Sequence, residues 1–235
     1  MLEVNPRASR TVPFLAKAMG LPLAQQATLL MLGKTLAEIG LTEDPQPKHW
    51  FAKAPVFPFK KFPGVDVLLG PEMRSTGEVM GVGATPGEAF LKALQGAGIN
   101  LPTKGCVFIS VNDRDKAGVI DVARTLHEMG FGLIGTRGTA LALFDAGLPA
   151  QLVFKVNQGR PNVADLIRDG GIQMVINTPL GDVSFFDDKA IRVAASAHGV
   201  PCMTTLSAAE AAVEAMQRAR TGGMERYAVL DWLTK

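Results

Sequence analysis

Short apolar runs alternate with segments of helical period throughout residues 105–235. Five of the runs are short enough to be strands, and they cover residues 106–111, 131–135, 152–155, 174–177 and 201–203. The segments between them repeat apolar residues at spacings of three and four, which places these residues on one face of a helix. Strands that alternate with amphipathic helices predict an α/β fold with a parallel sheet.

The helical pattern is clearest in two segments. Their apolar faces consist of Val119, Val122, Ala123, Leu126 and Met129 in the first, and of Ala209, Ala212, Val213 and Met216 in the second. Five strands linked by such helices predict a Rossmann-like layer of about 130 residues, close to the commonest domain size.

Residues 1–70 have a different character, because they hold more than half of the prolines and much of the phenylalanine. Each proline removes a hydrogen-bond donor from a strand, so the run from Ala54 to Phe59 is not expected to form a central strand. The first part of the chain therefore does not continue the pattern of the second.

A helix and a linker lie between the two parts. Thr85 and Glu88 predict a helix start in which Thr85 is the N-cap and Glu88 completes a capping box, and the helix should run to about Ala97. Glycine and proline follow at residues 98–104 with little apolar periodicity. We therefore expect one domain at residues 1–97, a linker at 98–104 and a second domain at 105–235.

Composition and charge exclude several classes of protein. The chain has 235 residues, of which 47% are hydrophobic and 20% charged, and this composition excludes disorder and collagen. The formal net charge of +2 does not indicate a nucleic-acid partner. No run approaches the roughly 20 apolar residues of a membrane helix, and residues 1–10 lack the apolar core of a signal peptide. These observations predict a cytoplasmic protein without a membrane partner. Cys106 and Cys202 lack CxxC spacing and are expected as free thiols.

Candidate chemistry gathers where the predicted strands end, because ligands of open α/β sheets lie at that edge, beside helix N-termini. Basic residues follow three of the strands, namely Lys116, Arg137, Lys155 and Arg160. Hydroxyl, amide and glycine residues accompany them, namely Ser110, Thr136, Gly138, Thr139, Asn177 and Thr178. Together they predict a phosphate site whose polar groups could also hold a sugar or a base. The carboxylates of this half are interpreted as structural, since acidic groups at helix starts complement the helix dipole.

Three motifs then identify a resemblance. Residues 2–14 (LEVNPRASRTVPF), residues 70–81 (GPEMRSTGEVMG) and residues 159–162 (GRPN) are similar to the C-terminal part of the large subunit of carbamoyl-phosphate synthase. The similarity covers essentially the whole chain. It implies that residues 1–97 are the end of the second ATP-grasp unit, which phosphorylates carbamate, and that residues 105–235 are a methylglyoxal-synthase-like regulatory domain.

The resemblance also implies roles for residues of the first part. Glu3 and Asn5 lie two apart on a predicted strand, so both side chains leave one face and can offer oxygen ligands to Mg²⁺ or Mn²⁺ bridging ATP phosphates. Arg7 and Arg10 are candidate catalytic residues that neutralise phosphate charge. K⁺ is a further candidate ion. A chain that opens in such a strand is expected to be cut within its ATP-grasp fold.

For the second part, the resemblance implies binding of a nucleotide effector, UMP or IMP, with ornithine as a candidate activator. The implied effector residues are Ser110, Lys116, Thr136, Arg137, Gly138, Thr139, Lys155, Asn177 and Thr178. Arg137 stands where some members have histidine, Pro179 where a second threonine occurs, and Ala54 where some have a glutamate that helps to bind ornithine. The choice of nucleotide and the ornithine response therefore remain open.

The function implied for the full enzyme is ATP-dependent synthesis of carbamoyl phosphate from glutamine-derived ammonia and bicarbonate, for pyrimidine and arginine synthesis. Its partners would be the rest of the large subunit and a glutaminase small subunit, in an oligomer, and the chain alone is expected to lack synthase activity. A stand-alone nucleotide-binding module is one alternative. A methylglyoxal-synthase-type lyase is another, but Arg160 follows Gly159 where that enzyme continues its glycine-glycine-aspartate motif.

Overall fold

The computed structural model describes residues 7–62, 67, 69, 72–180, 185–221 and 231. Its second half holds a five-stranded parallel sheet in the order β5-β4-β3-β6-β7. The strands are β3 (Cys106–Val111), β4 (Gly132–Gly135), β5 (Ala150–Leu152), β6 (Met174–Thr178) and β7 (Cys202–Met203). The predicted parallel α/β fold is confirmed.

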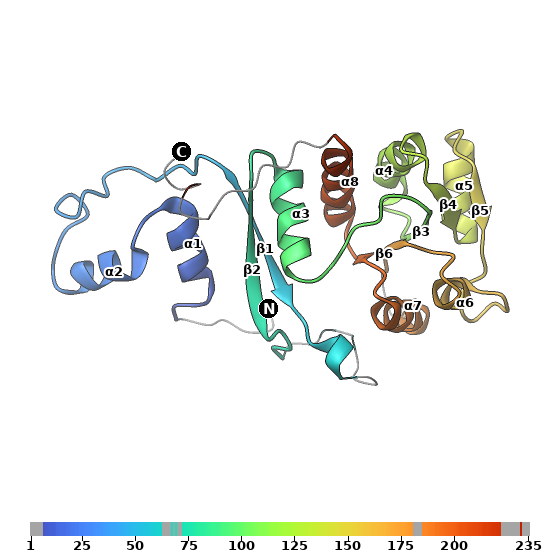
Figure 1. Ribbon diagram of the computed structural model, residues 1–235, viewed down its shortest axis with the longest axis horizontal. Coiled ribbons are helices and arrows are strands. Elements are labelled where there is room, and N and C mark those ends of the chain that lie inside the picture. The colour runs from blue at the N-terminus through green and yellow to red at the C-terminus, as the bar shows by residue number, and fades with distance from the viewer. Residues whose placement is uncertain are drawn as a thin grey trace.

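Five helices cover the two faces of this sheet (Figure 1). They are α4 (Lys116–Glu128), α5 (Arg137–Asp145), α6 (Val163–Arg168), α7 (Phe185–His198) and α8 (Leu206–Arg220). Helices α4, α5 and α8 cover one face, and α6 and α7 cover the other. The domain therefore has three layers, with the sheet in the middle.

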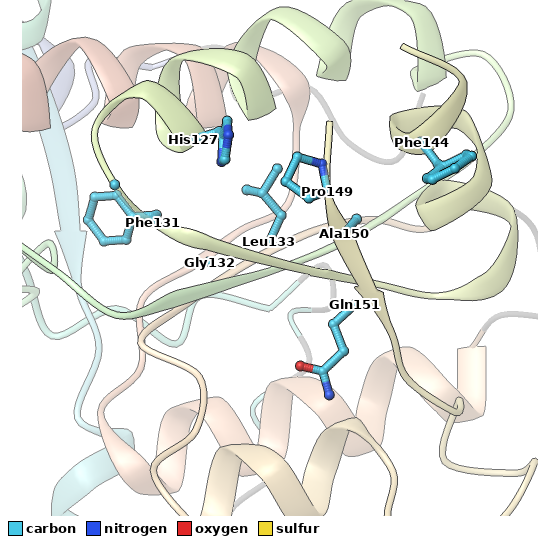
Figure 2. Close-up of a pocket in the computed structure, with 9 residues that line it drawn as sticks. His127, Phe131, Gly132, Leu133, Phe144, Pro149, Ala150 and Gln151 are labelled. Atoms are coloured by element: carbon cyan, nitrogen blue, oxygen red, sulfur yellow. The ribbon is translucent and has the colours of Figure 1, made fainter. Parts of the chain in front are cut away.

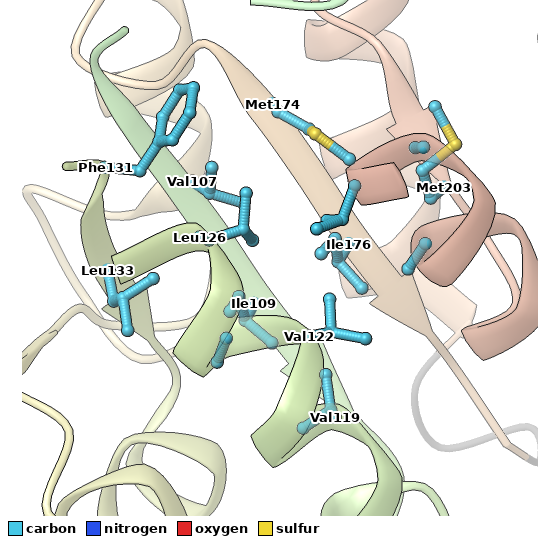
Figure 3. Close-up of a cluster of buried hydrophobic side chains, with 14 of the residues drawn as sticks. Val107, Ile109, Val119, Val122, Leu126, Phe131, Leu133, Met174, Ile176 and Met203 are labelled. Carbon is cyan, nitrogen blue, oxygen red and sulfur yellow. The ribbon is translucent and has the colours of Figure 1, made fainter. Parts of the chain in front are cut away.

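The central strand β3 alternates its side chains between two cores. Val107 and Ile109 pack under α4 and α8, while Phe108 packs under α6 and α7. Strand β6 lies beside β3 in parallel register, with Val107 opposite Met174, and alternates in the same way. Figure 3 shows the first of these cores, where Val119, Val122 and Leu126 of α4 meet both strands.

Strand ends agree with the sequence prediction to within one residue, except at β5. Residues 152–155 were predicted there, but β5 spans Ala150–Leu152 and pairs Ala150 with Leu133. Phe154 instead forms an isolated bridge with Asn162. The residues that pair with β4 are Ala150–Leu152, so the apolar run at residues 152–155 lies mostly beyond the paired segment.

The first part of the chain holds two short helices and a two-stranded antiparallel sheet. The helices are α1 (Thr11–Met19) and α2 (Leu23–Met31), and the strands are β1 (Trp50–Val56) and β2 (Gly77–Gly83), with a 3-10 turn η1 at Phe59–Lys61. Lys53 ties β1 to its neighbours, since its Nζ donates to Thr11 Oγ1 at 3.1 Å and pairs with Glu78 at 3.5 Å.

Helix α3 (Pro86–Gly96) lies between the two sheets and contacts both β2 and α8 (Figure 1). Thr85 Oγ1 accepts from the Glu88 N–H at 3.2 Å, as predicted for the N-cap. The other half of the predicted capping box is wrong, because the Glu88 carboxylate accepts from the Ala84 N–H at 2.9 Å and pairs with Lys92 at 2.7 Å. The glycines that face α3 and α8 allow this close packing: a Cβ on Gly81 would lie 1.9 Å from the Ala89 carbonyl oxygen.

Candidate functional site

A cleft of about 530 Å³ opens at the carboxyl ends of the central strands. Its lining residues come from the ends of β3, β4 and β6, from the loop after β5 and from α7, and they are Ser110, Val111, Asn112, Asp113, Arg114, Thr136, Lys155, Asn177, Thr178, Pro179, Leu180, Asp188 and Ile191. This is the edge at which ligands of open α/β sheets bind.

Hydroxyl groups meet at the start of α5. Ser110 at the end of β3 and Thr136 after β4 place their hydroxyl oxygens 3.2 Å apart. Thr136 is the N-cap of α5 with an extended backbone, and its side chain caps no N–H of that helix. The first-turn N–H groups of a helix have no partner within the helix, so this end of the cleft can bind an anion. Thr139 braces it, since its Oγ1 accepts from the Val111 N–H at 3.2 Å.

Lys116 brings positive charge to the same helix start. Its Nζ lies so close to α5 that a Cβ on Gly138 would come within 3.3 Å of it. The ammonium group pairs with the exposed Asp113 carboxylate at 2.7 Å, and this contact lowers the pKa of Asp113. A phosphate arriving here would meet an ammonium group beside free helix N–H groups, and it would compete with an exposed carboxylate for that charge.

Asn112 holds two strand ends together. Its Nδ2 donates to the Thr178 carbonyl oxygen at 3.0 Å and to Asp115 Oδ2 at 2.7 Å. The Asn112 backbone N–H donates to the same Thr178 carbonyl. Asn112 is not among the predicted site residues, because only the parallel register of β3 and β6 reveals its partner.

The opposite wall of the cleft contains a buried polar cluster. Asn177 Nδ2 donates to Asp188 Oδ1, and Arg192 Nε lies 3.0 Å from both carboxylate oxygens of Asp188. Asn177 and Asp188 are both buried. The spacing of Asp188 and Arg192 fits a helical i, i+4 pair in the sequence, but the contact with Asn177 has no sequence signal, because it joins β6 to α7.

The structure brings most of the predicted effector residues together. Ser110, Thr136, Lys155, Asn177 and Thr178 line the cleft, and Lys116, Gly138 and Thr139 adjoin it at α5. Arg137 is exposed in the first turn of α5 and is not among the lining residues. Arg160 is also outside the cleft and lies 3.8 Å from Asp165. The sequence missed Arg114 and Asp188 as lining residues.

Two of the residues predicted for phosphoryl transfer, Arg7 and Arg10, are exposed ahead of α1 and are not lining residues of the cleft. Glu3 and Asn5 lie outside the described residues. Among the residues that the structure describes, no group of three or more His, Cys, Asp or Glu side chains could hold a metal ion.

A second cleft of about 710 Å³ opens at the amino ends of β4 and β5 (Figure 2). Phe144 of α5 and His127 of α4 stand on two sides of it, with Gln151 below them. His127 and Gln151 are its polar side chains, and its remaining lining residues are glycine, proline or apolar. This second cleft lacks the ammonium group and the helix N-terminus that adjoin the first cleft. The first cleft is therefore the candidate site.

Comparison with known proteins shows what parts of this chain resemble. Residues 118–204 match the family model described as an MGS-like domain. The chain is 51% identical over 220 residues to the carbamoyl phosphate synthase large chain of Acidobacterium capsulatum, covering 91% of this chain and 20% of the relative. It is 50% identical over 233 residues to the large chain of Myxococcus xanthus, covering 99% of this chain and 22% of the relative. The chain carries an MGS-like domain.

The resemblance inferred from the sequence is thus confirmed. The MGS-like match runs from α4 to just beyond β7, so it includes Thr136, Lys155 and Asn177 of the cleft. The chain spans about a fifth of the length of the curated relatives it matches. No helix in the described ranges has both the length and the apolarity needed to cross a bilayer.

Proposed function

We propose that this chain is the C-terminal part of the large subunit of a glutamine-hydrolysing carbamoyl-phosphate synthase, and that its MGS-like domain binds a nucleotide effector. The full enzyme would make carbamoyl phosphate from two ATP, bicarbonate and glutamine in the cytoplasm, for pyrimidine and arginine synthesis. The identity of about 50% to carbamoyl phosphate synthase large chains supports this assignment. We also propose that residues 1–97 and 105–235 are its two domains, with α3 as the contact between them.

The observation that carries the effector site is the first turn of α5. An uncapped helix start, two hydroxyl groups 3.2 Å apart and an ammonium group converge there. Free N–H groups and a positive charge are what a phosphate needs, since each can donate a charge-assisted hydrogen bond. Of the residues named by the resemblance, Lys116, Thr136 and Thr139 are proposed to hold the phosphate.

The far end of the cleft suits a nucleobase. Pro179, Leu180 and Ile191 supply apolar surface, and Asn177 supplies one polar side chain among them. Ligand pockets of this kind combine apolar walls with a few polar groups that fix orientation. A ligand with a phosphate at one end and a flat heterocycle at the other would match both ends, which favours a nucleotide over inorganic phosphate.

A thermal-shift titration of the full chain tests this function. UMP or IMP at a hundred times its dissociation constant should stabilise the folded protein by about 2.7 kcal/mol. Lys116→Ala should lose most of this shift, because it removes the cation beside α5. Lys104→Ala is the matched control, since Lys104 is exposed at a distance from the cleft lining. The proposal fails if neither nucleotide shifts the unfolding transition. An ornithine arm, run in parallel, reports whether that amino acid binds as well.

The synthase role of the first part is tested separately. Arg7 and Arg10 are proposed to neutralise phosphate charge, and Glu3 and Asn5 to ligate Mg²⁺ or Mn²⁺. K⁺ is proposed as a further ion. The proposed partners are the rest of the large subunit and the glutaminase subunit. When bound, the metal would neutralise charge on the ATP phosphates. The isolated chain should release no ADP in a manner dependent on bicarbonate and ammonia, and such release would contradict the proposal.

A further inference from the structure

We infer that the Asp188–Arg192 ion pair is a positioning device that turns the Asn177 amide oxygen into the cleft, so that the site selects nucleobases with a ring N–H donor. This inference rests on the proposed nucleotide site and adds the chemistry of its selectivity. It concerns two residues of α7 that the resemblance did not name.

The orientation of Asn177 follows from hydrogen-bond chemistry. A carboxylate that is paired with a guanidinium group can only accept hydrogen bonds, so the amide atom that faces Asp188 must be the nitrogen. The Asn177 oxygen then points away from Asp188. Within the described residues this oxygen accepts no hydrogen bond, and Asn177 is a lining residue of the cleft. It is therefore an acceptor that a ligand can use.

Arg192 keeps this arrangement in place. Its Nε lies 3.0 Å from both oxygens of Asp188, one helical turn away on α7. A buried carboxylate is costly unless it is paired and hydrogen-bonded, and Asp188 has both forms of support. Because Asp188 is held from the α7 side, its remaining contact fixes the rotation of the Asn177 amide.

The position of Asn177 matches the base of a nucleotide rather than its phosphate. Strand β6 is separated from β4 by β3 alone, and neighbouring strands are about 4.8 Å apart, so Asn177 lies roughly 10 Å across the sheet from the start of α5. Leu180 and Ile191 line the same end of the cleft. A base whose phosphate binds at α5 would reach Asn177 with its edge.

An exposed amide oxygen discriminates between bases. Hypoxanthine and uracil carry a ring N–H that can donate to it, whereas adenine and cytosine present a ring nitrogen lone pair at the corresponding position. A lone pair facing the amide oxygen forms no hydrogen bond and leaves an acceptor unpaired. The wild-type protein should therefore bind IMP more tightly than AMP, and UMP more tightly than CMP.

Asp188→Asn tests the positioning role in the full chain. Arg192 would donate to the amide oxygen introduced at position 188, so the new amide nitrogen would face Asn177 and the Asn177 amide would turn over. Calorimetric titration should show the IMP-to-AMP affinity ratio falling by about tenfold or more, while affinity for ribose 5-phosphate, which has no base, stays unchanged. Asp121→Asn, on the exposed face of α4, is the matched control, and Arg192→Lys should largely retain the wild-type ratio.

Side-chain NMR separates this inference from the proposed function. In the wild-type protein one Asn177 amide proton should resonate downfield, because it is bonded to a carboxylate, and Asp188→Asn should remove that shift without any nucleotide present. If the NMR result holds but no nucleotide binds, the effector function is wrong while the positioning stands. If nucleotides bind and the IMP-to-AMP ratio is the same in wild type and Asp188→Asn, the inference is overturned.

Discussion

Helices α2 and α4 show how differently the two parts of the molecule bury their apolar residues. In α4, Val119, Val122, Ala123 and Leu126 are all buried against the sheet, whereas α2 buries none of its residues. Met31 is 88% exposed and Leu32, which follows α2, is 77% exposed. Both segments have an amphipathic sequence, so the difference lies in whether a second layer covers them. The five-stranded sheet supplies that layer for α4 within this chain.

The two parts also differ in what their apolar residues do. Two hydrophobic cores and the candidate cleft belong to the same sheet, so the elements that fold the second part also position its ligand groups. In the first part the apolar residues around α2 remain at the surface. Exposed apolar patches of this kind mark interaction sites, which agrees with a chain that spans about a fifth of its relatives.

The largest expected effect comes from removing a core side chain of the sheet. Phe108 in β3 is fully buried beneath α6 and α7, so Phe108→Ala should lower the free energy of unfolding by about 3–5 kcal/mol. Met31→Ser should change it by less than about 0.5 kcal/mol, because Met31 lies in solvent. Urea unfolding followed by circular dichroism measures both. Equal losses from the two substitutions would show that the first part has a core as tight as that of the sheet.

An intermediate effect is expected where α3 packs on β2. Gly81→Ala would place a Cβ 1.9 Å from the Ala89 carbonyl oxygen, so α3 would have to move off β2 at a cost of about 1–3 kcal/mol. Gly77 lies in the same strand with open space around it, so Gly77→Ala should be neutral or stabilising by up to about 1 kcal/mol. Matched unfolding curves of the two variants test the contact. A neutral Gly81→Ala would mean that α3 does not rest on β2.

A pH-dependent effect follows from Cys202 of β7, which is partly buried against the core under α6 and α7. Burial raises the pKa of the Cys202 thiol to about 12 from 9.0, with Arg192 lowering it and Asp188 raising it to a lesser extent. Above pH 9 the unfolded chain loses this proton while the folded chain keeps it. The free energy of unfolding should therefore fall by up to about 1.4 kcal/mol per pH unit between these two values.

Comparison with Cys202→Ala isolates this contribution, because other groups titrate alike in both proteins. The stability difference between wild type and variant should shrink as the pH rises from 8.5 to 10.5. Parallel curves over that range would show that the Cys202 thiol is open to water, and that the β7 side of the sheet is less tightly packed than β3.

The features predicted correctly from the sequence are those that depend on a local pattern of residues. Strand β3, the N-cap at Thr85 and the buried face of α4 agree with the prediction because apolar period and capping chemistry act within a few residues. The convergence of Ser110, Thr136, Lys155 and Asn177 on one cleft was also predicted, because parallel strands end at a common edge.

What the sequence missed depends on register and on contacts between distant elements. Asn112 bonds to Thr178, which is 66 residues away, and Asn177 bonds to Asp188 on a different element. Neither pair has a spacing rule. Asp188 was interpreted as a structural carboxylate, and its contact with a lining residue becomes visible only when β6 and α7 are placed side by side. Strand β5 was also misplaced, since the residues that pair with β4 are Ala150–Leu152.

We propose the cleft beside α5 as the nucleotide site, and hydrogen-exchange mass spectrometry of the full chain with and without IMP or UMP tests this proposal. We expect slower amide exchange at residues 110–116, 136–140 and 177–180 when nucleotide is bound, with no change at residues 11–56. Slower exchange confined to residues 127–133 and 149–151, which border the second cleft, would contradict it.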